Sequence, residues 1–221
     1  TRVIGNNSQL LRVDDEVESD IEASETQQLL TLISYIISHD KIDVIIFEDY
    51  NKGLITPRLI AKVVELARSK SILTCVDPKK KNFSAYKGVS LFKPNLKELR
   101  EGVKLDVSGD NINELQRAVS SFRVKQKIDT VLVTLAEKGV ITNSRKLKEH
   151  LPAHIRSIAD VSGAGDTVIS VAALCRALEC NDVLTAAIAN LAGGLVCKKI
   201  GIVPVNKEQL LEETLKLDFV R

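Results

Sequence analysis

Short apolar runs alternate along this chain with longer segments of helical periodicity, and this alternation constrains the fold more than any other feature. The apolar runs are rich in β-branched residues and lie at 42–47, 72–76, 89–92 and 130–134. Apolar residues recur at helical spacing in the segments 19–38, 57–68 and 111–125. Strands that are apolar throughout must be covered on both faces, and crossover helices can cover them. The sequence therefore predicts an α/β fold with a mainly parallel central sheet.

Both ends of the chain depart from this alternation. Residues 1–14 alternate polar and apolar side chains around Gly5-Asn6-Asn7, which predicts a hairpin of two short strands. Beyond residue 134 we expect a short strand pair within 139–151, followed by helices at 164–178, 182–199 and 206–217. The expected organisation is a hairpin at 1–16 and one α/β core at 17–221. Because Thr1 already lies inside the first expected strand, the sequence suggests a fragment.

Composition narrows the classes of partner. The 31 basic and 29 acidic side chains are dispersed and nearly cancel to a net charge of +2, so we expect no field that would recruit nucleic acid or a membrane surface. No apolar run approaches the roughly 20 residues that span a bilayer. The four cysteines form no C-x-x-C pair, which favours free thiols in a cytoplasmic protein over disulfides or zinc. A small anionic ligand remains compatible with this balance.

The segment Asp160-Val-Ser-Gly-Ala-Gly-Asp166-Thr167 runs directly into an apolar helical stretch. Its small residues Gly163, Ala164 and Gly165 let the backbone approach a ligand closely, and the N–H groups and dipole of a helix N-terminus attract phosphate. Beside such an anion hole, Asp166 makes chemical sense as a base that takes a proton from an attacking hydroxyl. A tight turn with Asp166 as an ordinary N-terminal helix acid is the alternative, and the segment alone does not separate the two. It has neither a P-loop ending nor G-x-G-x-x-G spacing.

Two upstream segments also end apolar runs with polar residues. Lys93 and Pro94 follow one run, so we expect Asn95 to begin a helix with Glu98 three residues later. On this segment alone, an ordinary capping box is the favoured explanation of that spacing, and Lys93 could be a solvated surface lysine. Another run ends at Thr134 and is followed by a loop that reaches Gly139.

In this order and spacing, the three segments resemble the signatures of the PfkB, or ribokinase-like, carbohydrate kinases. The resemblance implies a three-layer α/β/α fold, ATP and Mg²⁺ as cofactors, an anion hole formed by Gly163, Ala164 and Gly165, and Asp166 as the catalytic base. It also implies nucleotide contacts, and the residues concerned are Lys93, Asn95, Glu98, Thr134, Gly139 and Asn190. Asn95 and Glu98 would organise Mg²⁺ through water. Ala136 departs from the pattern, because the family has a glycine at that place in the loop.

Three further stretches resemble the heptose phosphate kinases within this family, which form the kinase half of bacterial ADP-heptose synthesis enzymes. They are Asp49-Tyr50-Asn51-Lys52-Gly53, Asp77-Pro78-Lys79 with the residues up to Tyr86, and 1–14. The resemblance implies phosphorylation of the anomeric hydroxyl of heptose 7-phosphate. From the residues themselves, basic side chains suit a substrate that already carries phosphate, and Asp49 follows a strand at the edge where α/β proteins bind ligands. The expected substrate residues are Arg2, Arg12, Asp49, Lys52 and Lys79.

Two alternatives remain open from the sequence. One is a kinase for a different sugar or a nucleoside. The other is a nucleotide-binding module without turnover, because the family's first strands, with its principal sugar-binding residues, would precede the hairpin. By the same resemblance, residues 1–16 are the remnant of a β lid, and we expect a homodimer formed through that lid.

Overall fold

The computed structural model describes residues 1–5, 8–104, 111–153 and 159–217, and it contains two sheets. The larger sheet has six strands in the order β3-β4-β5-β6-β7-β8. Its parallel strands are β3 (Val44–Glu48), β4 (Leu73–Asp77), β5 (Leu91–Phe92) and β6 (Thr130–Thr134). Two antiparallel strands complete it, β7 (Val140–Ser144) and β8 (Lys148–Leu151). The mainly parallel sheet that the apolar runs predicted is confirmed.

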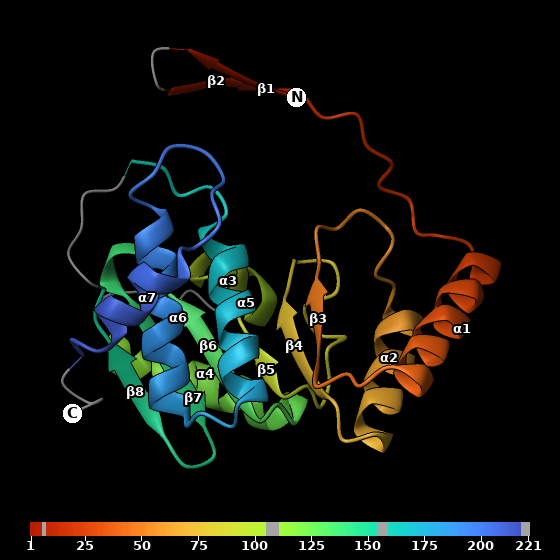
Figure 1. Ribbon diagram of the computed structural model, residues 1–221. Coiled ribbons are helices and arrows are strands. Elements are labelled where there is room, and N and C mark those ends of the chain that lie inside the picture. Colours follow the sequence, from red (N-terminus) through yellow and green to blue (C-terminus); the bar gives the residue numbers. More distant parts are fainter. Residues whose placement is uncertain (6–7, 105–110, 154–158, 218–221) are drawn as a thin grey trace.

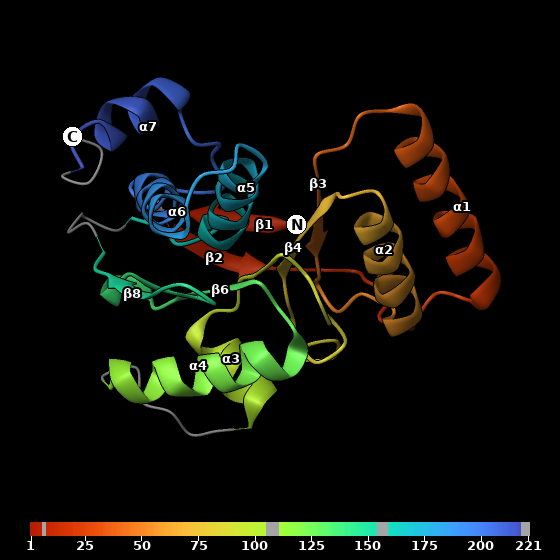
Figure 2. The same ribbon diagram turned by 90° about the horizontal axis from the view of Figure 1, so that it is seen from below.

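Helices cover both faces of this sheet (Figure 2). One face carries α5 (Ala164–Ala177) and α6 (Asp182–Val196), with α7 (Lys207–Thr214) packed outside them. The other face carries α1 (Ala23–His39), α2 (Pro57–Ser69), α3 (Leu96–Val103) and α4 (Ile112–Gln126). The fold is therefore the expected three-layer α/β/α arrangement.

Alternation within each strand supplies two cores. In β6, Val131 and Val133 pack into the core beneath α2, α3 and α4, whereas Leu132 packs into the core beneath α5 and α6. Successive side chains of a strand point to opposite faces, so a central strand must be apolar at every position to serve both cores. This is the physical reason why the strands appear as unbroken apolar runs.

The boundaries of three helices differ from the expected ones by three or more residues. The first begins at Ala23 rather than at residue 19, because Glu22 and Glu25 form a capping box there. The segment before it instead extends along the core, where the Ile21 amide donates to the Gly53 carbonyl at 3.1 Å. The helix expected at 182–199 ends at Val196, and the one expected at 206–217 ends at Thr214. Within the described residues, no helix is long and apolar enough to cross a bilayer.

The hairpin of β1 (Arg2–Gly5) and β2 (Ser8–Arg12) stands away from the core (Figure 1). The segment that follows it is tied to the core by ion pairs, of Lys52 with Glu16 and Glu18 and of Lys81 with Asp20. The hairpin thus forms a separate layer that is attached to the core through residues 16–21.

The outer edge of the sheet lies at β3, which pairs only with β4 among the described strands. Ile46 on this strand is 38% exposed. Helix α1 lies beyond β3 (Figure 2), and its apolar side chains Leu32 and Tyr35 are also exposed. The β3 side of the molecule therefore presents apolar surface that the described chain does not cover.

Candidate active site

Three carboxylates meet where the parallel strands end. Glu48 is the last residue of β3, Asp77 is the last residue of β4, and Asp166 lies in the first turn of α5. Their oxygens all lie within 4.8 Å of one another. The carboxyl ends of parallel strands share one edge of the sheet, and α/β proteins bind ligands at that edge. We call these three residues the carboxylate cluster.

The glycine-rich loop reaches the same place because the residues around it hold its shape. Asp160 accepts hydrogen bonds from the Ser162 amide and the Gly201 amide, each at 2.9 Å. Gly163 is the N-cap of α5 and has a φ of +78°, a backbone conformation that L side chains rarely adopt. A β-carbon on Gly165 would lie 3.5 Å from Lys93 Nζ and 3.7 Å from Asp77 Oδ2. Helix α5 therefore begins next to the side chains at the ends of the strands.

The predicted anion hole corresponds to the N-terminus of α5, with one adjustment. The Ala164 amide donates to the Val161 carbonyl at 3.2 Å, so this donor is used within the turn. The next amides, of Gly165 and Asp166, belong to the first turn, where a helix supplies no intrahelical acceptor. Together with the helix dipole, these groups favour an anion at the mouth of the loop.

Lys93 is a buried lysine, with 2% of its surface exposed. Its Nζ lies 3.0 Å from Asp77 Oδ1. Burial raises the pKa of Asp77, while the charges of Lys93 and Lys79 act to lower it. The interpretation of Lys93 as a solvated surface lysine is therefore wrong, and its cation is aimed at the carboxylate cluster beside Gly165.

Glu48 was not expected from the sequence, which pointed instead to its neighbour Asp49. The Asp49 carboxylate is buried and accepts from the Asn51 amide at 2.9 Å, from Asn82 Nδ2 at 3.0 Å and from Tyr86 Oη at 2.9 Å. Asp49 is thus occupied in holding the loop, whereas Glu48 joins the carboxylate cluster. Burial raises the pKa of Glu48 to about 8, and the nearby charges of Asp77 and Asp166 add to that effect.

Asn95 and Glu98 form a complete capping box at the start of α3. Asn95 Oδ1 accepts from the Glu98 amide at 2.8 Å, and Glu98 Oε2 accepts from the Asn95 amide at 2.9 Å. The other oxygen of Glu98 pairs with Lys79 Nζ at 2.5 Å. Lys79, expected as a substrate residue, also lies 4.0 Å from Asp77 Oδ1, so it bridges the capping box and the carboxylate cluster.

The strand-end loop lies beside that capping box. Thr134 forms a parallel bridge with Asn95, and its amide donates to the Pro94 carbonyl at 3.1 Å. Gly139 has a φ of +88°, and a β-carbon there would lie 2.1 Å from the Leu151 carbonyl oxygen. Asn190, on α6, donates to the Pro152 carbonyl at 3.0 Å. The structure thus brings Thr134 close to Asn95, while Gly139 and Asn190 position the chain after β8.

Of the remaining expected substrate residues, the structure describes the side chain of Lys52 alone. Lys52 is paired with Glu16 and Glu18 of the segment that leads from the hairpin. The side chains of Arg2 and Arg12 lie outside the described part of the structure, although their backbones pair with each other in the hairpin.

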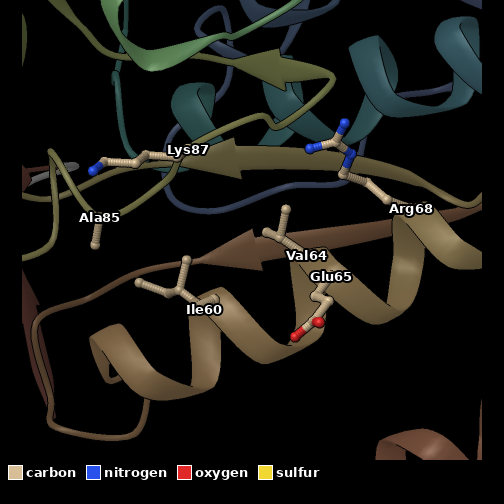
Figure 3. Close-up of a pocket in the computed structure, with 7 residues that line it drawn as sticks. Ile60, Val64, Glu65, Arg68, Ala85 and Lys87 are labelled. Carbon is tan, nitrogen blue, oxygen red and sulfur yellow. The ribbon is translucent and has the colours of Figure 1, made fainter.

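A pocket of about 390 Å³ lies elsewhere, between α2 and the segment before β5 (Figure 3). Ile60, Val64 and Ala85 supply its apolar walls, and Glu65, Arg68 and Lys87 lie at its rim. No residue that lines it belongs to the carboxylate cluster or the glycine-rich loop.

The geometry agrees with the family comparison, in which residues 25–208 match the pfkB family carbohydrate kinases. The chain belongs to this family. The membership of this family that the three motifs predicted is thereby confirmed.

Relatives of this PfkB-family chain are longer than the chain itself. A bifunctional protein HldE from Methylobacillus flagellatus is 35% identical over 215 residues, which cover 96% of this chain and 43% of the relative. A bifunctional protein HldE from Shewanella baltica is 36% identical over 215 residues, with the same two shares of 96% and 43%. The chain thus spans less than half the length of these curated relatives.

Solved structures share the fold at low sequence identity. Escherichia coli phosphofructokinase-2 in complex with substrates and products gives a TM-score of 0.79 at 16% identity, covering 96% of this chain and 67% of that one. Arabidopsis thaliana ribokinase complexed with ribose and ATP gives a TM-score of 0.66 at 15% identity, covering 90% and 61%. These likenesses establish the ribokinase-like fold.

Proposed function

We propose that this chain provides the nucleotide-binding and phosphoryl-transfer part of an ATP- and Mg²⁺-dependent kinase that phosphorylates the anomeric hydroxyl of heptose 7-phosphate to give heptose 1,7-bisphosphate. The sequence similarity to HldE proteins across 96% of the chain supports this choice of sugar within the family. Free thiols at all four cysteines are compatible with a cytoplasmic enzyme.

The observation that carries the proposal is the meeting of Lys93, Gly165 and Asp166 at the end of the sheet. The buried Lys93 cation and the N-terminus of α5 both attract an anion, and Asp166 lies in the same helical turn. An in-line phosphoryl transfer needs charge neutralisation on one side and a proton acceptor on the other. In the proposed reaction, Asp166 takes the proton of the sugar hydroxyl while Lys93 and the helix N-terminus hold the transferred group.

Asn95 and Glu98 are the residues that we propose to hold Mg²⁺ through water. Their amide and carboxylate oxygens are the hard donors that this ion prefers, and water commonly completes its shell. Glu98 is only 12% exposed at its side chain and lies next to Lys79, so the ion and the nucleotide phosphates would share one electrostatic environment. Thr134, Gly139 and Asn190 are proposed to line the nucleotide side. The bound ion would supply neutralisation of phosphate charge.

We propose that two further parts of the protein complete the sugar-binding site. Further strands would join the exposed edge of β3, which is supported by the apolar surface there and by the third of phosphofructokinase-2 that this chain does not match. The hairpin would act as a lid that closes over the sugar and pairs with a second copy, with Arg2, Arg12 and Lys52 facing the substrate phosphate.

The test uses the complete protein with a panel of heptose 7-phosphate, fructose 6-phosphate, ribose and a nucleoside, each with ATP and Mg²⁺. The proposal predicts the highest kcat/KM for heptose 7-phosphate. A preference for another sugar would keep the family assignment and replace the substrate. If ATP–Mg²⁺ binds by calorimetry while no sugar is turned over, the chain is a nucleotide-binding module and the proposed activity is wrong.

A further inference from the structure

Glu48 occupies an unusual place for a charged side chain. Both of its carboxylate oxygens are buried, and neither accepts a hydrogen bond from the described residues. Its polar neighbours include two more carboxylates, Asp77 and Asp166, within 4.8 Å. An ionised carboxylate that is buried without donors and placed beside like charges is strongly disfavoured, whereas its protonated form can donate a hydrogen bond. The arrangement therefore favours a proton on Glu48.

The neighbouring groups identify the acceptor of that proton. Asp77 already has a cation, because Lys93 Nζ lies 3.0 Å from its Oδ1 and Lys79 Nζ lies 4.0 Å from the same atom. Tyr50, in the loop after β3, is a further titratable group near Glu48. Burial raises its pKa, as do the charges of Asp166 and Glu48 and a side-chain hydrogen bond with Asp166. A phenol is itself a donor at neutral pH. Asp166 is therefore the carboxylate in the cluster that can accept from Glu48.

We propose that Glu48 is a positioning residue, whose protonated carboxyl donates a hydrogen bond to the Asp166 carboxylate and holds it oriented toward the substrate hydroxyl. This inference rests on the proposed function only for the role of Asp166 as base. The proton sharing itself is a property of the chain without substrate.

The proton balance of the reaction follows directly. The sugar oxygen forms a bond to the γ-phosphorus as the bond from that phosphorus to the bridging oxygen of ADP breaks. The hydroxyl proton moves to the Asp166 oxygen that Glu48 does not occupy, and the proton of Glu48 stays where it is. Burial and the charges of Asp77 and Asp166 raise the pKa of Glu48 to about 8, so this arrangement persists at neutral pH. Above that pH, ionised Glu48 would repel both Asp166 and the phosphate.

Kinetic tests of the complete protein compare Glu48→Gln, Glu48→Ala and the control Glu65→Gln on the distant helix α2. The wild type and the control should lose kcat as pH rises above about 8, in line with the raised pKa of Glu48. Glu48→Gln keeps a donor that does not titrate, so its kcat at pH 7 should fall only about threefold and should stay level at alkaline pH. Glu48→Ala should lose kcat at least about tenfold with little change in KM for ATP. An alkaline decline in Glu48→Gln equal to that of the wild type would overturn the proposal.

A second measurement does not depend on catalysis. Carboxyl ¹³C NMR of the 221-residue chain without substrates should give a midpoint near pH 8 for Glu48, and Asp166→Asn should lower that midpoint by removing a nearby charge. A Glu48 midpoint close to the reference value of 4.5, or one that Asp166→Asn leaves unchanged, contradicts proton sharing even if the kinase is active. If Glu48 and Asp166 titrate together but the protein phosphorylates no sugar, the proposed function is wrong and the hydrogen bond between these two residues is still supported.

Discussion

The two ends of α5 lie in polar environments that differ in whether the carboxylate there receives hydrogen bonds. At its C-terminal end, Arg176 Nη1 and Thr130 Oγ1 both donate to Asp182 Oδ1 at 3.0 Å. At its N-terminal end, Asp166 meets Glu48, whose oxygens have no donor among the described residues. The buried carboxylate at one end of the helix therefore has two donors, although Arg176 Nε there has no partner among the described residues, whereas the Glu48 carboxylate at the other end has none.

A second buried network strengthens this contrast at the amino ends of the strands. Asn143 on β7 donates to Gln116 Oε1 at 2.7 Å and to Ser120 Oγ at 2.9 Å, and it accepts from Arg123 Nε at 3.1 Å. Buried polar groups with complete partners stabilise a fold, whereas unpaired ones cost free energy. We infer that the amino ends of the strands stabilise the molecule, while the carboxyl ends keep groups available for a ligand.

The largest expected effect is the loss of kcat on changing Asp166, the aspartate at the N-terminal end of α5. Asp166→Asn removes the proposed base, so kcat should fall on the order of 10³-fold, within the range for loss of a general base. The same change removes one of three crowded carboxylates, so the free energy of unfolding should not decrease. Steady-state kinetics and urea denaturation of one preparation measure both quantities.

Asp182→Asn is the matched control at the other end of α5. It weakens the contacts of Arg176 and Thr130, so stability should fall by about 1–3 kcal/mol while kcat stays unchanged. If Asp182→Asn abolished turnover, or if Asp166→Asn were fully active, the functional division between the two ends would be wrong.

The next effect concerns the Asn143 network, where Asn143→Ala takes a partner from the half-buried side chains of Gln116 and Arg123. We expect a loss of about 1–2 kcal/mol in the free energy of unfolding, because groups that are half-buried and unpaired carry part of their desolvation cost. Urea denaturation gives the value, and kcat/KM serves as the control because Asn143 is remote from the carboxylate cluster. A destabilisation below about 0.5 kcal/mol would show that the network is not a major stabilising feature.

A comparable effect depends on pH at the N-terminal end of α5. The folded-state pKa of Glu48 is raised from 4.5 to about 8, so the stability contributed by its proton is complete below pH 4.5 and is lost as pH rises through 8. Glu48→Gln lacks this titration. As pH rises from 5 to 8, the free energy of unfolding of Glu48→Gln should therefore increase relative to that of the wild type, by on the order of 2 kcal/mol. Parallel stability curves for the two proteins would contradict the assignment of the proton to Glu48.

The sequence predicted the elements better than the orientation of side chains within them. Apolar periodicity located the sheet and its helices, because each central strand must serve two cores. The same uniformity concealed the site, since a strand that is apolar on both faces does not reveal whether Glu48 or Asp49 faces the ligand edge. Burial of Lys93 was equally hidden, because it depends on Asp77 from a different strand. The sequence did not show which side chains of neighbouring strands lie next to each other, because this depends on how the strands pair in the folded sheet.

The smallest expected effect tests whether the carboxyl ends also hold backbone strain. Ala136, in the loop after β6, has a φ of +53°, which is unfavourable for an L-residue with a β-carbon. Ala136→Gly should remove that strain and, after the greater entropy of the unfolded chain is subtracted, stabilise the protein by about 0.5–1 kcal/mol. Ala61→Gly in α2 is the matched control and should destabilise by about 1 kcal/mol, because Ala61 has ordinary helical geometry. The two urea midpoints should therefore move in opposite directions. If both midpoints fall, the backbone at Ala136 is not strained.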